Sequence, residues 1–155
     1  MKHSNLVLNS IQDFAQELGF PSTIQFSVNY EKEPDLYQVL IQAPNPGPII
    51  GYHGETLSAL QLLMGQHLHA KTGEWLNLSL NVNDYRERRE VALKSLADTA
   101  VSQVKNTNTP HSLPPMPASE RRIIHLYLSE NPDVATSSEG VGKNRYLIIS
   151  PKNAG

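Results

Sequence analysis

The sequence predicts an α+β protein made of two small domains. Two observations carry this prediction. The hydrophobic positions switch several times between the 3.6-residue period of a helix and the two-residue period of a strand. A polar segment with several prolines, residues 106–117, separates a long first run of elements from a short second one. With 155 residues, 39% of them hydrophobic and 18% charged, the chain has a globular composition.

The first elements read as a helix followed by two strands. Apolar residues in 5–18 recur at the spacing of an amphipathic helix, and Gly19 with Pro21 ends it. Residues 24–30 alternate between apolar and polar, which predicts a strand with one buried face. After a short turn, residues 36–42 read as the antiparallel return strand.

A glycine-containing loop between two helical pieces follows. Three prolines in residues 43–48 prevent the second strand from continuing and stiffen the approach to Gly51-Tyr52-His53-Gly54. Residues 55–70 are helical again, and residues 76–82 alternate as a third strand. The helix has one apolar face, formed by Leu57, Leu60, Leu63, Met64 and Leu68.

The second half begins with a long helix. We expect this helix over residues 84–104, capped by Asp84 and densely charged in its first turns, Tyr85-Arg86-Glu87-Arg88-Arg89. After the linker at 106–117, residues 118–129 form a further helix, and residues 145–150 form a strand before Pro151.

Charge is divided unevenly along the chain. The net charge is −2 and the pI about 6.3, so the composition does not indicate a strongly basic nucleic-acid binder. Residues 1–83 hold three basic and seven acidic residues, whereas residues 84–155 hold ten basic and eight acidic ones. A polyanionic partner should therefore contact mainly the second half. The absence of cysteine excludes disulfides and thiol chemistry and fits a cytoplasmic location.

The Gly51-Tyr52-His53-Gly54 loop is the strongest local motif. Two glycines between helices let the backbone approach a phosphate chain closely, and the next helix offers free N–H groups and its positive dipole end. The order helix, strand, strand, helix, GxxG, helix, strand resembles the type II KH domain, whose loop clamps about four nucleotides of a single strand. The resemblance implies that Gly51, Tyr52, His53 and Gly54 hold the nucleic-acid backbone. It also implies an apolar floor under the bases, built by Ile49, Ile50 and Leu57.

A second motif lies in the C-terminal part. Arg121 and His125 are four residues apart, which places them on one helix face. Residues 116–125, 136–140 and 144–146 around them resemble the R-3-H domain, a small α/β domain that is named for this Arg-x-x-x-His pair and binds single-stranded nucleic acid. The resemblance implies phosphate contacts, which we expect from Arg121, Arg122, His125, Lys143 and Arg145.

Together the two motifs and the Tyr85-Arg86-Glu87-Arg88-Arg89 run resemble the bacterial Jag family of SpoIIIJ-associated proteins, also called KhpB or EloR. The resemblance predicts a short form with a KH domain at 1–83, a connecting helix at 84–104, an R-3-H domain at 105–155, and no Jag-N domain. It implies non-catalytic binding of single-stranded RNA, with single-stranded DNA as a further ligand, in post-transcriptional regulation or as an RNA chaperone. It also implies a link to cell elongation and envelope synthesis, and pairing with a small single-KH protein.

Two features leave alternatives open. Loops of this family usually hold Lys or Arg in the middle, where this chain has Tyr52 and His53. Tyr52 stacks on a base in one interpretation and packs on its own domain in the other. The acidic first half supports a rival function, an adaptor whose KH domain dimerises or docks without binding RNA.

We find no residue pattern for an enzyme, a metal site or a cofactor. Gly140-Val141-Gly142-Lys143-Asn144 lacks the first glycine of a P-loop and reads as a glycine turn.

Overall fold

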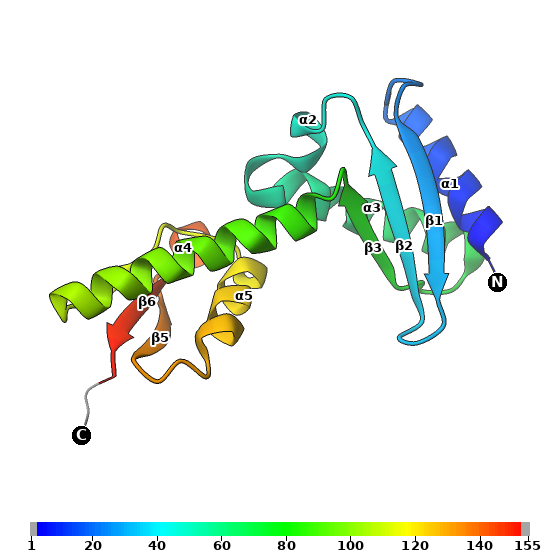
Figure 1. The fold of residues 1–155 in the computed structure, drawn as a ribbon. Helices are drawn as coiled ribbons and strands as arrows, with labels where there is room; N and C mark the ends of the chain where they lie inside the picture. Colours follow the sequence, from blue (N-terminus) through cyan, green and yellow to red (C-terminus); the bar gives the residue numbers. More distant parts are fainter. Residues whose placement is uncertain (1–2, 153–155) are drawn as a thin grey trace. The chain divides into compact units, whose positions relative to one another are not determined.

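The computed structural model describes residues 3–152 and divides into two compact units, with the boundary after Arg86 (Figure 1). Each unit has its own sheet and its own hydrophobic core. This confirms the α+β class, which the hydrophobic periods predicted. In the described part of the chain, no helix combines the length and the apolar character that crossing a membrane requires.

The first unit contains three helices, a one-turn 3-10 segment and a three-stranded sheet. In chain order these are α1 (Ser4–Glu17), β1 (Gln25–Glu31), β2 (Leu36–Gln42), α2 (Gly47–Ile50), η1 (Tyr52–Gly54), α3 (Glu55–Thr72) and β3 (Leu78–Val82). The strand order is β1-β2-β3, with β2 antiparallel to β1 and parallel to β3. The parallel pair requires a crossover. The segment from α2 to α3, which contains the glycine loop, supplies it.

The core of this unit lies between the sheet and helices α1 and α3. On β2, Tyr37, Val39 and Ile41 are buried in alternation, as expected for a strand with one covered face. α1 adds Val7 and Ile11 to the same cluster. α3 adds Leu57, Leu60, Met64 and Leu68.

One position on the expected apolar face of α3 was predicted wrongly. Leu63 is 45% exposed, and its neighbour Leu62 is 62% exposed. The helix meets the core only along a narrow stripe, since Leu60 and Met64 already fill the turn on either side. α3 therefore carries apolar side chains on its outer face as well.

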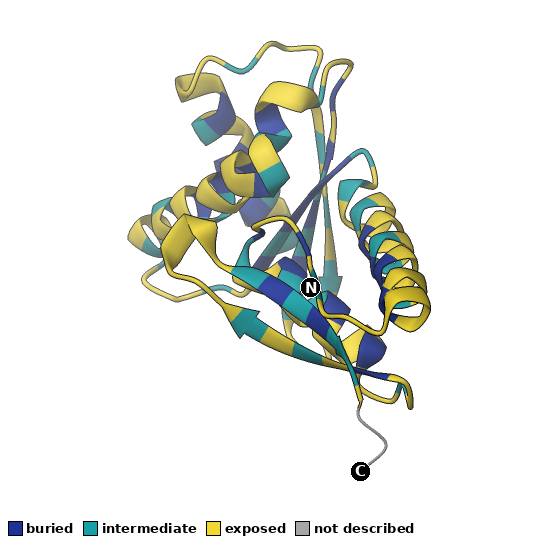
Figure 2. Ribbon diagram, turned by 90° about the vertical axis from the view of Figure 1, so that its left-hand side faces the viewer, coloured by how far each residue is buried: buried dark blue, intermediate teal, exposed yellow. Residues whose placement is uncertain are grey.

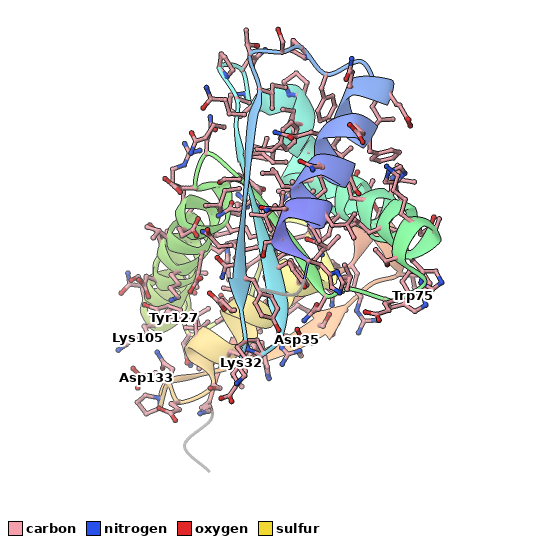
Figure 3. The ribbon with its side chains drawn as sticks, turned by 90° about the vertical axis from the view of Figure 1, so that its right-hand side faces the viewer. Lys32, Asp35, Trp75, Lys105, Tyr127 and Asp133 are labelled. Carbon is pink, nitrogen blue, oxygen red and sulfur yellow. The ribbon has the colours of Figure 1, made fainter. Side chains whose placement is uncertain are left out.

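The C-terminal end of α3 is covered by aromatic side chains. His67 stacks on Phe14 of α1, with ring centroids 4.6 Å apart. His69 stacks on Trp75 at 4.0 Å, and Trp75 projects from the end of this helix (Figure 3). The two histidines thus point to different partners, as expected for residues two apart on a helix.

The second unit packs a long helix, a short helix and an antiparallel sheet. Helix α4 (Tyr85–Thr107) begins at the end of the first unit and continues into the second. It is followed by β4 (His111–Ser112), α5 (Ala118–Leu128), β5 (Val134–Glu139), η2 (Gly142–Asn144) and β6 (Tyr146–Pro151), with strand order β4-β6-β5. The core residues of α4 are Leu93, Ala97, Ala100 and Val104.

Two strands of this sheet were not predicted. The expected linker at 106–117 contains β4, and it also buries Leu113 and Met116 in the core. β5 buries only Val134 fully, and its other positions alternate between exposed and half-buried (Figure 2). Its sequence, Val-Ala-Thr-Ser-Ser-Glu, carries no apolar alternation because β5 is an edge strand with one neighbour, β6.

The start of α4 is fixed differently from the expectation that Asp84 caps it. Asp84 has a positive φ of 58°, and Asn81, which is buried, accepts the Arg86 backbone N–H at 3.1 Å through Oδ1. Arg86 then donates through Nε to the Leu80 carbonyl oxygen at 2.7 Å and through Nη2 to Gln61 Oε1 at 3.0 Å. The cap is supplied from the preceding strand, since the tight turn at 83–84 reverses the chain.

An ion pair joins α4 to α5. Arg89 donates through Nε to Glu120 Oε1 at 2.7 Å and through Nη2 to Glu120 Oε2 at 2.9 Å. The Glu120 side chain is 7% exposed and that of Arg89 30%. This two-pronged geometry fits guanidinium to carboxylate well. It places α5, with Arg121 and His125, against α4.

We predict that Arg89→Met destabilises the second unit. The substitution removes the two-pronged guanidinium partner of the buried Glu120 carboxylate, and this loss costs about 2–3 kcal/mol, near the low end for buried pairs. Lys94→Met is the matched control, since Lys94 pairs with Glu90 on the exposed side of the same helix at 2.7 Å. This exposed pair contributes about 0.5 kcal/mol or less. Native-state hydrogen exchange of β6 amides measures the loss of stability in each variant. Equal losses in the two variants would contradict a structural role for the Arg89–Glu120 pair.

Candidate nucleic-acid interface

The glycine loop follows directly on α2. Gly51 has φ 70° and ψ −174°, and a Cβ placed on it would lie 2.1 Å from Thr56 Oγ1 and 2.7 Å from Thr56 Cβ. No side chain fits in that space, and the positive φ is costly for any other residue. Gly51 is therefore required by the contact between the loop and the first turn of α3.

The second glycine makes room for a tyrosine of the charged motif. Gly54 is buried with φ 77°, and a Cβ there would lie 3.2 Å from Cε1 of Tyr85. Tyr85 is half-buried and packs against the core of the first unit. Tyr85, the first residue of the Tyr85-Arg86-Glu87-Arg88-Arg89 run, thus packs against the loop at Gly54. The sequence alone did not predict this contact.

The two middle residues of the loop differ in exposure. Tyr52 is 75% exposed, and its ring meets the His53 ring edge-on at 4.1 Å. His53 is half-buried and has φ 51°. Tyr52 does not pack into its own domain, so the second interpretation of this residue was wrong. Its ring is available to a ligand.

The electrostatics of the loop are not cationic. Helix α3 begins at Glu55, which places an exposed carboxylate in the first turn, beside the free N–H groups. A negative side chain at this position favours the helix but opposes an approaching phosphate. Contacts to this loop would therefore rely on backbone amides and on the Tyr52 ring rather than on side-chain charge.

An apolar pocket of about 310 Å³ lies beside the loop. It is lined by Phe20, Pro21, Ile24, Asn45, Pro48, Ile49, Thr56 and Leu60. Ile49 and Leu57, which we expected under the bases, are buried in the core, and Ile50 is half-buried. Sequence spacing could not identify Phe20, Pro21 and Ile24 as neighbours of the loop, because the fold brings them there from a distant segment.

In the second unit, the Arg-x-x-x-His pair faces β5. Arg121 donates through Nη1 to Ser138 Oγ at 2.5 Å, and His125 Nδ1 lies 2.6 Å from Thr136 Oγ1. Four residues of a helix rise about 6 Å, and two residues of a strand span about 6.6 Å. The distance between Arg121 and His125 along α5 therefore matches the distance between the hydroxyls of Ser138 and Thr136 along β5. His125 is exposed and Arg121 is half-buried, so neither is a core residue.

Two guanidinium groups converge on Ser138. Arg145, which directly precedes β6, donates through Nε to the same Oγ at 2.9 Å, and Arg121 also donates to the Met116 carbonyl oxygen at 3.2 Å. Within residues 3–152, no carboxylate lies at salt-bridge distance from either guanidinium. A hydroxyl oxygen accepts these bonds without neutralising the charge. The pair therefore offers two uncompensated positive charges to an anion.

Two further cations lie on the same unit. Arg122 is exposed on α5, next to Arg121. Lys143 is exposed in η2, within the glycine turn that joins β5 to β6. The sequence-based interpretation of Gly140-Val141-Gly142-Lys143-Asn144 as a glycine turn is confirmed.

Comparison with known proteins relates both units to described domains. A model of the KH domain of KhpA and KhpB matches residues 9–81, and a model of the R3H domain matches residues 91–151. RNA-binding protein KhpB of Streptococcus pneumoniae serotype 2 is 39% identical over 143 residues, which cover 92% of this chain and 42% of the relative. The chain belongs to the KhpB family. The predicted resemblance is thereby confirmed.

Other KhpB proteins show a similar relation. RNA-binding protein KhpB of Clostridium symbiosum is 35% identical over 129 residues, 83% of this chain and 58% of the relative. That of Bacillus subtilis is 41% identical over 106 residues, 67% of this chain and 51% of the relative. The chain thus spans about half the length of these curated KhpB relatives.

We predict that Gly51→Ala destabilises the first unit more than Gly19→Ala. Both glycines have a positive φ, 70° and 81°, but the space around Gly19 is open. Gly19→Ala costs about 1–2 kcal/mol for the positive φ. Gly51, with ψ −174°, has a backbone conformation that is nearly restricted to glycine and costs about 1–3 kcal/mol for alanine, and Gly51→Ala adds about 1–3 kcal/mol for the clash with Thr56. Urea unfolding, followed by the fluorescence of Trp75, the single tryptophan, measures the difference. Equal losses would mean that the loop moves away from Thr56 at no cost.

Proposed function

We propose that this chain binds single-stranded RNA without catalysis, through one surface on each domain. The observation that carries the proposal is the convergence of Arg121 and Arg145 on Ser138, with no carboxylate of residues 3–152 at salt-bridge distance from either guanidinium. Two guanidiniums that share one neutral acceptor repel each other, and a bound anion would offset this repulsion. KhpB relatives are named RNA-binding proteins, and a phosphate of the RNA backbone is the anion that this relation supports.

The KH domain would contribute mainly uncharged contacts. In the proposal, the backbone amides of Gly51-Tyr52-His53-Gly54 approach the RNA chain, and Tyr52 stacks on a base. The pocket beside the loop receives a second base against Pro48 and Phe20. Ile50 borders this surface, while Ile49 and Leu57 support it from the core.

The R3H domain would contribute most of the phosphate contacts. Residues 84–155 carry the excess of positive charge, whereas residues 1–83 are net acidic. Arg121, Arg122, Lys143 and Arg145 are the cations of this surface, and His125 adds a polar contact. Phosphate contacts carry no base information, so we expect this domain to bind unrelated single strands with similar affinity.

A second candidate function is an adaptor that binds protein through its KH domain. Leu62 and Leu63 support it, because they are two adjacent exposed leucines in the middle of α3. The acidic charge of the first half favours it too. The two functions are distinguished by the binding of the chain to labelled single-stranded RNA, which the adaptor does not require.

The broader cellular role rests on the family resemblance. We include in the proposal a part in post-transcriptional regulation or RNA chaperoning linked to cell elongation and envelope synthesis, and pairing with a small single-KH protein. A cytoplasmic setting belongs to the same proposal, and the absence of cysteine fits it.

We predict a moderate salt dependence that depends on the R3H cations. About three to five phosphate contacts give a log–log slope of about −2 to −3.5 for RNA affinity against salt. Arg121→Ala with His125→Ala should weaken binding to unrelated sequences alike and reduce the slope by about 0.7, since one phosphate contact is lost. Fluorescence anisotropy at several salt concentrations measures both effects.

A matched control separates binding from structure in that experiment. Thr136→Val with Ser138→Ala removes the hydroxyl partners on β5 but keeps both Arg121 and His125. This control should bind RNA with the slope of the parent chain. If it loses as much affinity as the Arg121/His125 variant, the pair acts by fixing α5 to β5, and its assignment to phosphate is wrong.

We predict that Tyr52→Asp with His53→Asp reduces RNA affinity while the domain remains folded. Tyr52 is exposed, and Asp tolerates the positive φ of position 53 better than most residues do. Two carboxylates would repel the RNA backbone and remove the stacking ring. Gln12→Glu with Gln16→Glu is the charge-matched control, which adds the same charge on exposed positions of α1. Equal RNA affinity of both folded variants would remove the loop from the site.

A further inference from the structure

Val141 is the most exposed of the large hydrophobic side chains in residues 3–152, at 86%. It lies in the turn between β5 and β6, and it contributes nothing to the core of its unit. The turn itself does not need an apolar residue there. Its backbone is extended, with φ −131° and ψ 138°, a conformation that polar residues adopt equally well.

The turn that presents Val141 is held by its own contacts. Gly140 has φ 89°, and a Cβ on it would lie 2.9 Å from the Asn144 carbonyl oxygen, so the two sides of the turn are in close contact. The Asn144 N–H donates to the Val141 carbonyl oxygen and the Arg145 N–H to that of Gly142, both at 3.2 Å. Val141 is thus held in place without being covered.

The same turn is bonded to one of the two converging cations. Arg145 donates through Nη1 to the Gly140 carbonyl oxygen at 3.5 Å, while its Nε bonds Ser138. The residue next to Val141 in the chain therefore contacts the guanidinium that we assign to phosphate. Lys143 follows two positions later and is exposed. An apolar side chain consequently projects from a turn that is followed by two exposed cations, Lys143 and Arg145, and preceded by the exposed Glu139.

We propose that Val141 packs against the face of a nucleobase whose neighbouring phosphate is held by Arg145 and Arg121. This inference rests on the proposed binding of single-stranded RNA and adds a base contact to a domain otherwise assigned to phosphates. In a single strand the bases are not paired, so their apolar faces are open to contact. A single valine flanked by two glycines offers too little apolar area to dock a protein, but it covers part of one base.

The experiment compares two ligands on the full chain. One is a labelled oligouridylate, and the other is a ribose–phosphate strand of the same length without bases. Val141→Ser should weaken oligouridylate binding about 3- to 10-fold, because an apolar contact is lost. It should leave the abasic strand and the salt slope unchanged, because no charge is removed. Val141→Ile, which keeps an apolar β-branched side chain, should retain the affinity of the parent chain.

A matched control tests whether any exposed valine has this effect. Val91 is 69% exposed on α4, which contributes none of the assigned phosphate contacts, and Val91→Ser should bind both ligands like the parent chain. If Val141→Ser binds oligouridylate like the parent chain, or weakens both ligands equally, the base contact is refuted while RNA binding stands. If the parent chain binds neither ligand above background, the proposed function fails, and the base contact fails with it.

Discussion

The first two turns of α4 hold fixed partners on which both candidate surfaces depend. Tyr85 occupies the space that Gly54 leaves open, and Arg86 closes the end of β3 by bonding the Leu80 carbonyl oxygen. Arg89, one turn later, holds the buried carboxylate of Glu120 at the start of α5. The charged run Tyr85-Arg86-Glu87-Arg88-Arg89 is therefore largely structural. Its side chains position a loop in one unit and a helix in the other.

The distribution of charge divides the two surfaces by the kind of contact they can make. The KH loop has a carboxylate at Glu55 and an exposed ring at Tyr52, so it favours stacking and backbone contacts. The R3H surface has guanidiniums whose nearest acceptor is a neutral hydroxyl, so it favours phosphate. A chain with net charge −2 can thus still offer a local cationic site, because the compensating acids lie elsewhere.

The fold and the motifs were predictable from sequence where the signal is local. Alternation marked β1 and β2, the 3.6-residue period marked α1 and α3, and a four-residue spacing placed Arg121 and His125 on one face. Features that depend on distant partners were not predictable. Asn81 caps α4 because a turn reverses the chain. Ser138 accepts hydrogen bonds from Arg121 and Arg145 because α5 packs on β5 and β6 pairs with it. β5 was not predicted as a strand because a polar edge strand has no apolar alternation.

The parallel pairing of β2 with β3 has a consequence for how the two surfaces form. The glycine loop lies inside the crossover between these strands, whose pairing joins Tyr37 to Leu78. The two strands pair only when that long segment closes, and the entropy of closure is lost before the pairing contacts form. Ser138 and Arg145, in contrast, are separated by one hairpin turn. The contact between Ser138 and Arg145 therefore needs only short-range chain closure, whereas the strands that flank the glycine loop pair over a long sequence separation.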